Sequence, residues 1–249
     1  MLEIDRIVDH HCHGIITADL ERPEYEALMA EAHLPAPKGC SQFDKPLGLL
    51  IRRHCAPLLD LEPHATASDY VARRLELGGQ EASRRLMRAT GVSELLIDTG
   101  HRSDSILDVP QMAEITNCVT REVPRIEAIM EQAAKEASSA TELVDTFDAL
   151  LQAHSKDAIG LKSIVAYRVT FDIDQTDPNR EDVVQAAGNW LADHQANGWS
   201  RLCDPVLIRY ALFRALDICS ERNFPLQLHN GVGDQDIAMP KCDPTVFVP

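Results

Sequence analysis

The sequence predicts an α/β fold in which short apolar strands alternate with amphipathic helices. Its 249 residues, 45% hydrophobic and 25% charged, have the profile of a globular protein with room for one large core. Beyond residue 90, runs rich in Ile, Leu and Val are bounded by Gly, Pro, Asn or Asp, which is typical of strands. The segments between them carry apolar residues at helical spacing. This alternation favours βαβ units and a parallel sheet.

Five segments fit the strand pattern. A closed barrel of alternating strands and helices needs eight strands. We therefore expect either an incomplete (β/α)8 barrel of the TIM type, limited to its strands one to five, or a smaller open α/β sheet. The expected strands are residues 4–13, 92–99, 124–130, 158–167 and 224–229.

Helices are expected between these strands. Asp204 followed by Pro205 is typical of a helix start, and Asn223 before Pro225 is typical of a helix end. Apolar residues recur at helical spacing between these two ends, as they also do in residues 143–151.

Residues 17–90 break the alternation. They carry helical patterns, the clearest from Asp69 to Met87 with an end at Gly91, and several Pro-rich breaks. The sequence predicts a helical insertion after the first strand, within one barrel domain of residues 1–249. We expect this insertion to lie over the mouth of the sheet, where the loops after strands gather.

The charge and the cysteines limit the class of partner. The net charge is −15 and the Lys and Arg residues are dispersed, whereas nucleic-acid binding needs basic surfaces. The sequence has neither an apolar run long enough to span a membrane nor the pattern of a signal peptide. Its seven Cys form no CxxC pair. We expect a cytoplasmic protein with a small-molecule substrate and no nucleic-acid or membrane partner; assembly into a homo-oligomer is left open.

The first expected strand ends in residue types that bind metals. Asp9, His11 and His13 alternate, so a regular strand places them on one face, with His10 and Cys12 on the other. Two imidazoles about 7 Å apart along a strand can bind one metal ion. Such pairs also occur by chance, but this one lies at the carboxyl end of a strand, where barrel sites are built. His11 and His13 are the predicted ligands, and Cys12 is expected to pack in the interior.

A third ligand is predicted at the end of the fifth strand. Gln227 and His229 share one face, while Leu226 and Leu228 share the other and are expected to pack on helices. A lone histidine at a strand end is more often structural. With the first two histidines, His229 completes the three protein ligands of a typical catalytic zinc site.

Lys162 lies in the apolar run of the fourth strand. A buried ammonium is unfavourable unless it is paired or neutral. Three interpretations stay open: a head group that reaches solvent, a contact to a substrate carboxylate, or a carbamate that bridges two metals. Tyr167 and Arg168 follow, and Arg168 is a candidate to hold an anionic substrate group. Weaker candidates, which either orient a ligand histidine or lie in solvent, are Asp98, His101 and Glu127.

Together these segments resemble the amidohydrolase superfamily, specifically its amidohydrolase-2 type and the branch also found fused to glutamine synthetase-like domains. Residues 9–13 resemble the D-x-H-x-H of the family's first strand. Residues 160–168 resemble its fourth-strand segment, and residues 226–234 its fifth-strand metal-histidine segment. The three segments appear in the family's order and span most of the chain.

The resemblance implies a distorted (β/α)8 barrel with one or two divalent metal ions, commonly zinc. It implies that His11, His13 and His229 are ligands and that Lys162 is a bridging ligand or a substrate contact. The implied reaction is hydrolysis of an amide or related C–N or ester bond by a metal-activated water.

The family also has a sixth-strand histidine and an eighth-strand aspartate, and this sequence shows neither. Asp9 or Asp234 would then have to act as the base, and the chain alone is expected to bind metal weakly or to be inactive. Two alternatives stay open: a metal-dependent decarboxylase on the same barrel, and a truncated, non-catalytic binding or assembly chain.

Overall fold

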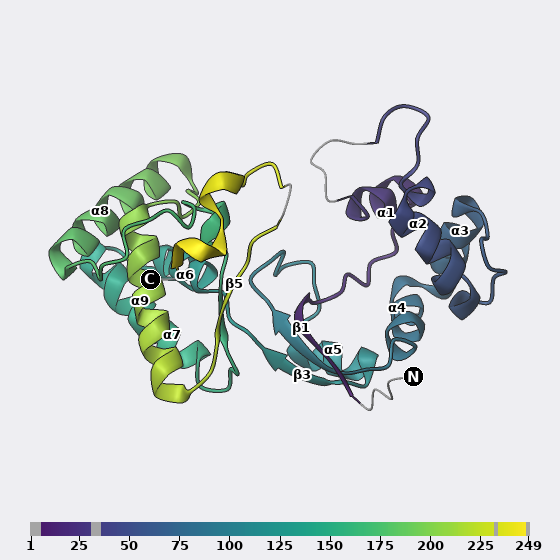
Figure 1. Ribbon diagram of the computed structural model, residues 1–249, viewed down its shortest axis with the longest axis horizontal. Helices are drawn as coiled ribbons and strands as arrows, with labels where there is room; N and C mark the ends of the chain where they lie inside the picture. Colours follow the sequence, from purple (N-terminus) through teal and green to yellow (C-terminus); the bar gives the residue numbers. More distant parts are fainter. Residues whose placement is uncertain (1–5, 31–35, 232–233, 248–249) are drawn as a thin grey trace. The chain divides into compact units, whose positions relative to one another are not determined.

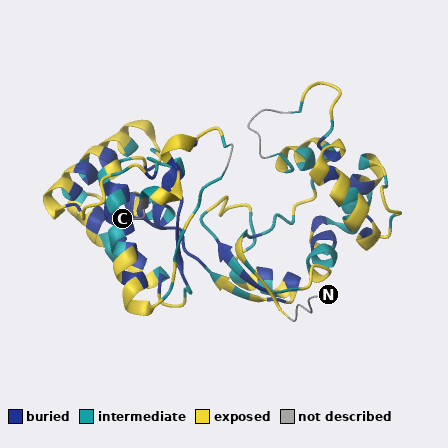
Figure 2. Ribbon diagram, in the orientation of Figure 1, coloured by how far each residue is buried: buried dark blue, intermediate teal, exposed yellow. Residues whose placement is uncertain are grey.

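The computed structural model describes residues 6–30, 36–231 and 234–247 (Figure 1). The chain divides into two compact units, Met1–Arg121 and Glu122–Pro249, here called unit 1 and unit 2. Buried apolar residues form a core in each unit (Figure 2). Each unit is described by itself.

Unit 1 contains a three-stranded sheet in the order β1-β2-β3. The strands are β1 (Ile7–His13), β2 (Val92–Asp98) and β3 (Val119–Glu122), and β1 pairs in parallel with β2. Helix α5 (Val109–Thr116) contributes Met112 to a small core with the buried side chains of β2. The expected strand at residues 92–99 is confirmed. The expected first strand is confirmed from residue 7, and its residues 4 and 5 lie outside the described residues.

The pairing of β1 with β2 is interrupted at the histidines. Asp9 lies opposite Leu95, but Cys12 lies opposite Ile97, so three steps along β1 match two steps along β2. An extra residue of this kind is a β-bulge, and it breaks the alternation of side chains between the two faces. The regular alternation expected from the sequence therefore does not hold across residues 9–12.

The described residues between β1 and β2 form four α-helices. Their apolar core is centred on three aromatic rings, Tyr25, Phe43 and Tyr70, whose centroids lie 5.7–6.0 Å apart. These helices belong to the same compact unit as the first sheet, and an insertion over residues 17–90 stays a prediction. The helices are α1 (Arg22–Leu28), α2 (Pro46–Leu50), α3 (Ala67–Leu77) and α4 (Gly79–Arg88).

Unit 2 is built around one large apolar core. Its helices are buried on their inner sides and exposed on their outer sides (Figure 2). A two-stranded parallel sheet of β4 (Leu161–Ser163) and β5 (Leu226–Leu228) packs against α6 and α9. The helices are α6 (Ile126–Glu136), α7 (Ala140–His154), α8 (Arg180–Asn197) and α9 (Pro205–Arg222).

The helix predicted after residue 204 is confirmed in α9. The Asp204 carboxylate accepts the backbone N–H groups of Val206 and Leu207, as an N-cap residue does. Asn223 ends the helix in the left-handed conformation, with φ of 54°. The apolar stripe at residues 143–151 lies in α7, as expected.

The third strand was wrongly predicted. Residues 126–136 form helix α6, and the third strand of the structure is β3 instead. Ile126, Ile129 and Met130 recur at helical spacing and are buried in the core of unit 2. A short apolar run of this kind fits a strand or a buried helix equally well, and packing decides between them. Arg125 alone forms a strand-like bridge, to Lys162.

The last two strands are shorter than expected. Of residues 158–167, three form β4, and Val165–Tyr167 form a 3-10 turn. Of residues 224–229, three form β5. Leu226 packs against the large core as expected, but Leu228 is 37% exposed.

The expected barrel is wrong. The described residues form five strands, in one sheet of three and one sheet of two. A barrel closes only when its strands pair on both sides in a continuous ring. Several of these strands have only three or four residues, and helices contain far more of the described residues than strands do. Across the described part of the chain, no helix is long and apolar enough to cross a membrane.

Candidate functional site

His13 ends β1 opposite Asp98, the last residue of β2. Its Nδ1 lies 3.0 Å from the backbone oxygen of Asp98 and 3.8 Å from the carboxylate of the same residue. A carbonyl oxygen only accepts, so Nδ1 donates, and the neutral ring keeps its lone pair on Nε2. Metal-binding histidines have this arrangement, with one ring nitrogen donating to an oxygen and the other free to bind.

His101, from the loop after β2, adds a second imidazole at this position. The ring centroids of His13 and His101 lie 4.9 Å apart. The structure thus brings Asp98 and His101, two of the weaker candidates from the sequence, to one predicted ligand.

The residues before His13 have different surroundings. Asp9 Oδ1 accepts the backbone N–H of His11 at 3.1 Å, a local bond that turns the chain at the bulge. His11 is exposed, whereas His13 is half-buried. The Cys12 thiol donates to the backbone oxygen of Leu96 and packs in the small core of unit 1, as expected. The catalytic role of Asp9 and the ligand role of His11 remain predictions.

Gly14 positions the loop that follows β2. A Cβ atom at this position would lie 2.1 Å from the backbone oxygen of Leu107, which is too close for any other residue. The Leu107 N–H in turn donates to the Ile15 backbone oxygen at 3.0 Å. The glycine therefore permits the close approach of a backbone segment.

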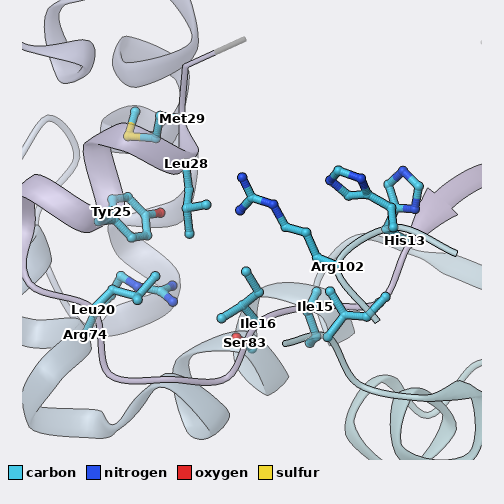
Figure 3. A pocket seen from close by; sticks show the side chains of 13 residues that line it. His13, Ile15, Ile16, Leu20, Tyr25, Leu28, Met29, Arg74, Ser83 and Arg102 are labelled. Atoms are coloured by element: carbon cyan, nitrogen blue, oxygen red, sulfur yellow. The ribbon is translucent and has the colours of Figure 1, made fainter. Parts of the chain in front are cut away.

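A cavity of about 380 Å³ opens beside His13 within unit 1 (Figure 3). This volume suits a small organic molecule. Its polar lining consists of His13, His101, Tyr25, Ser83, Arg74 and Arg102, and its remaining lining side chains, here called the apolar wall, are Ile15, Ile16, Leu20, Leu28, Met29 and Ile106.

In unit 2, Lys162 is only 1% exposed, so its head group does not lie in solvent. The next residue, Ser163, donates through its hydroxyl to Glu127 Oε1 at 2.5 Å, and the Ile164 N–H donates to the same oxygen at 3.0 Å. Glu127 Oε2 has no hydrogen-bond partner among the described residues. Burial raises the pKa of Glu127 above its usual value. Glu127 therefore fastens α6 to β4.

His229, directly after β5, belongs to a chain of three side chains. The Tyr167 hydroxyl donates to Asp234 Oδ2 at 2.5 Å, and His229 Nε2 lies 2.9 Å from that hydroxyl. Because the tyrosine proton goes to Asp234, His229 Nε2 donates, and Nδ1 carries the lone pair of the neutral ring. Burial and the hydrogen bond to Asp234 raise the pKa of Tyr167. Tyr167, predicted to bind substrate, thus orients a predicted ligand.

Arg168 is held by an internal partner. Its Nη1 donates to Glu131 Oε1 at 2.7 Å and to the Leu202 backbone oxygen at 3.2 Å, and its side chain is 8% exposed. These contacts join α6 to the segment before α9. A substrate-binding role for Arg168 remains a prediction.

The predicted ligand histidines have hydrogen bonds of the kind that orient metal ligands, but the described residues do not gather into a complete ligand set. The Asp98 carbonyl oxygen fixes Nδ1 of His13 as a donor, which leaves the lone pair of the neutral ring on Nε2, as in a metal-binding histidine. His229 Nε2 lies in hydrogen-bond contact with the Tyr167 hydroxyl. Across residues 6–30, 36–231 and 234–247, however, no three His, Cys, Asp or Glu side chains group as a metal site. The ligand roles of His11, His13 and His229 therefore remain predictions.

Comparison with known proteins relates the chain to a hydrolase. No family model matches it. Protein fluG of Emericella nidulans is 22% identical over 276 aligned residues, which cover 98% of this chain and 31% of fluG. A crystal structure from Lactobacillus casei ATCC 334, of a protein provisionally described as a metal-dependent hydrolase, matches with a TM-score of 0.71 and 26% identity, over 97% of this chain and 63% of that one. The chain thus spans about a third of fluG and less than two thirds of the Lactobacillus protein, and almost all of it is similar to both.

Proposed function

We propose that this chain acts as a metal-dependent hydrolase on an amide or related C–N or ester bond of a small molecule. The observation that carries the proposal is the arrangement of His13. Its Nδ1 is fixed by the Asp98 carbonyl, its Nε2 keeps a lone pair, and the ring lines a cavity of about 380 Å³. The similarity to the Lactobacillus protein, provisionally described as a metal-dependent hydrolase, supports it independently.

In this proposal His11, His13 and His229 supply ligands for one or two divalent ions, zinc by preference. When bound, such an ion supplies a water with a pKa near 7 and polarises the scissile carbonyl. The Asp98 carbonyl holds His13 in the tautomer that leaves Nε2 unprotonated, and Tyr167 holds His229 in the tautomer that leaves Nδ1 unprotonated. Lys162 remains a candidate for a substrate-carboxylate contact or a bridging carbamate.

Two carboxylates are candidates for the base that accepts the proton of the attacking water. Asp9 accepts the N–H of His11, and Asp234 accepts the hydroxyl of Tyr167, which contacts His229. Each carboxylate is thus linked through a hydrogen bond to the surroundings of a predicted ligand. Asp9 is the first candidate and Asp234 the second.

Metal content tests the proposal. The full chain is incubated with zinc, desalted and measured by elemental analysis, beside His13→Ala, His229→Ala and the control His54→Ala, which changes an exposed histidine of unit 1. We expect about one zinc per wild-type chain, a loss of most of it in the two ligand variants, and no loss in the control. Equal zinc in all four proteins would refute the metal site.

A decarboxylase is the second candidate, favoured by the two arginines of the cavity, since guanidinium groups suit a carboxylate. Turnover of small acids, amides and esters in ¹⁸O-water separates the two reactions, because only hydrolysis places ¹⁸O in the organic acid that is formed, whereas decarboxylation gives an unlabelled organic product and CO2.

A non-catalytic chain that works in an assembly is the third candidate. It is favoured because no three His, Cys, Asp or Glu side chains group as a metal site among the described residues. It predicts no turnover by the isolated chain and a partner-dependent or homo-oligomeric state in size-exclusion chromatography, whereas an active monomer would exclude it.

A further inference from the structure

The cavity of unit 1 has an unusual charge for this chain. The sequence has 39 acidic and 24 basic residues, a net charge of −15. Yet the described residues that line the cavity include Arg74 and Arg102 and neither Asp nor Glu. A positive pocket in an acidic protein attracts a negatively charged ligand, because low-dielectric walls concentrate the field of the charges.

Neighbouring arginines of unit 1 are paired, whereas these two are not. Arg73 and Arg85 both bind the Asp60 carboxylate, and Arg84 pairs with Glu81. Among the described residues, neither Arg74 nor Arg102 forms an ion pair.

Each of the two free guanidinium groups is nevertheless held in place. The Arg74 guanidinium carbon lies 4.9 Å from the centroid of the Tyr25 ring, a cation–π contact that keeps it at the cavity. Arg102 has a φ of 52°, a left-handed conformation that a non-glycine residue adopts at a cost. Its carbonyl accepts the N–H groups of Ser105 and Ile106, which fix this turn.

The direction of Arg102 separates the two ends of the cavity. Its side chain extends from the side of His13 toward Leu28 of α1 (Figure 3). Leu28 belongs to the apolar wall, so the Arg102 side chain runs from the His13 end of the cavity toward this wall. A ligand that matches this lining carries an anionic group and an apolar body. The end of the ligand opposite the anionic group then lies at His13.

We propose that this cavity binds a small organic acid whose carboxylate pairs with Arg102 while Arg74 adds a second positive charge. The apolar body packs on the apolar wall, and the end opposite the carboxylate lies at His13. As a statement about the substrate, this inference rests on the proposed function: the hydrolysed bond then lies away from the carboxylate. As a statement about binding, it stands alone.

The test measures binding without metal or turnover. Isothermal titration calorimetry on the EDTA-treated full chain compares 3-phenylpropanoate with 3-phenylpropanamide and with inorganic phosphate. We expect the acid to bind about tenfold more tightly than either, because the amide lacks the charge and phosphate lacks the apolar body. Equal affinity for acid and amide, or phosphate binding as tight as that of the acid, would overturn the proposal.

Variants locate the site. Arg102→Gln is expected to weaken binding of the acid about tenfold, and Arg74→Gln is expected to weaken it by less. The control Arg84→Gln leaves the affinity for the acid unchanged. Leu28 is 42% exposed and so tolerates truncation. Leu28→Ala is expected to weaken binding of the acid about threefold and to leave binding of phosphate unchanged. Unchanged acid affinity in Arg102→Gln and Leu28→Ala, with melting temperatures like wild type, would place the acid elsewhere. Because metal content is measured separately, a missing metal site would refute the proposed function and leave this result standing.

Discussion

The two units hold their polar strand-end residues in different ways. In unit 2, Lys162 and Ser163 of β4 are at most 1% exposed, as is Glu127 of α6, which accepts the Ser163 hydroxyl beside a single large apolar core. In unit 1, the His13 side chain is 34% exposed and borders an open cavity, and the apolar residues form two smaller clusters. The same sequence pattern, a polar side chain at the end of an apolar strand, thus gives an internal fastening in one unit and a ligand-accessible group in the other.

The difference shows what covering helices do to a strand end. In unit 2, β4 packs against α6 and α9, so Ser163 is buried and donates its hydroxyl to Glu127 rather than to solvent. In unit 1, the residues after β1 pass along the cavity, so His13 can meet a ligand.

The largest expected effect is a loss of stability when a buried phenylalanine of either unit is truncated. Phe147→Ala should lower the free energy of unfolding of unit 2 by about 3–5 kcal/mol, because it leaves a large cavity in a continuous core. Both tryptophans of the chain, Trp190 and Trp199, lie in unit 2, so fluorescence in a urea titration follows that unit.

Phe43→Ala is the matched control, since both phenylalanines are 0% exposed. It should shift the far-UV circular dichroism transition and leave the tryptophan transition in place. If both variants shift the tryptophan signal equally, the units unfold together and the comparison fails.

The next effect concerns Gly231. A Cβ atom there would lie 2.2 Å from Asp234 Oδ2 and 2.4 Å from the Tyr167 hydroxyl. Gly231→Ala should therefore break the hydrogen bonds that orient His229 and cost about 1–3 kcal/mol. Gly188→Ala in α8, where the nearest atom is 3.5 Å away, should instead stabilise by about 0.5–1 kcal/mol. Thermal melts measure the change in stability, and the NMR resonances of the His229 ring report on its hydrogen bonds. Unchanged His229 resonances in Gly231→Ala would contradict the prediction.

Glu127 predicts a pH dependence. Burial raises its pKa above the usual 4.5, so the folded state binds the proton more tightly than the unfolded chain. Its stabilising contribution is complete below about pH 4.5 and is lost as the pH rises through the folded-state pKa. Glu127→Gln should flatten this dependence and stabilise unit 2 by roughly 1–2 kcal/mol at pH 7.

Glu142→Gln is the control with the opposite sign. Hydrogen bonds from Ser138, first from its hydroxyl, lower the pKa of the exposed Glu142, so its contribution is present above its usual pKa and is lost as the pH falls. Identical pH profiles for the two variants in urea titrations would contradict the assignment.

The smallest effect is expected at the surface of unit 1. The Asp60 carboxylate binds Arg73 at 2.6 Å and Arg85 at 2.7 Å, which joins α3 to α4. Asp60→Asn should lower the melting temperature of unit 1, followed by circular dichroism, by about 1–2 °C. The difference should vanish in 1 M salt, where exposed charges are screened. A difference that persists at high salt would show that the contact is not mainly ionic.

The elements that followed from the sequence are those with local causes. The start of α9 depends on Asp204 bonding to the next two N–H groups, and its end depends on Asn223 adopting the left-handed conformation. The strand at residues 92–98 depends on its own apolar pattern. The run at residues 124–130 was ambiguous, because its apolar residues fit a strand or a buried helix and the core of unit 2 selected the helix.

By itself, the sequence determined the chemistry available: imidazoles at the end of an apolar strand, a lysine in an apolar run, and helix ends marked by their caps. The tertiary structure decided how these groups are used. Three features depend on segments far apart in the chain: the bulge before His13, the hydrogen bond from Ser163 to Glu127, and the cavity that Arg102 lines together with residues of α1. The physical reason is that side-chain spacing acts within a few residues, whereas burial and hydrogen bonding to distant segments are fixed only when the chain packs.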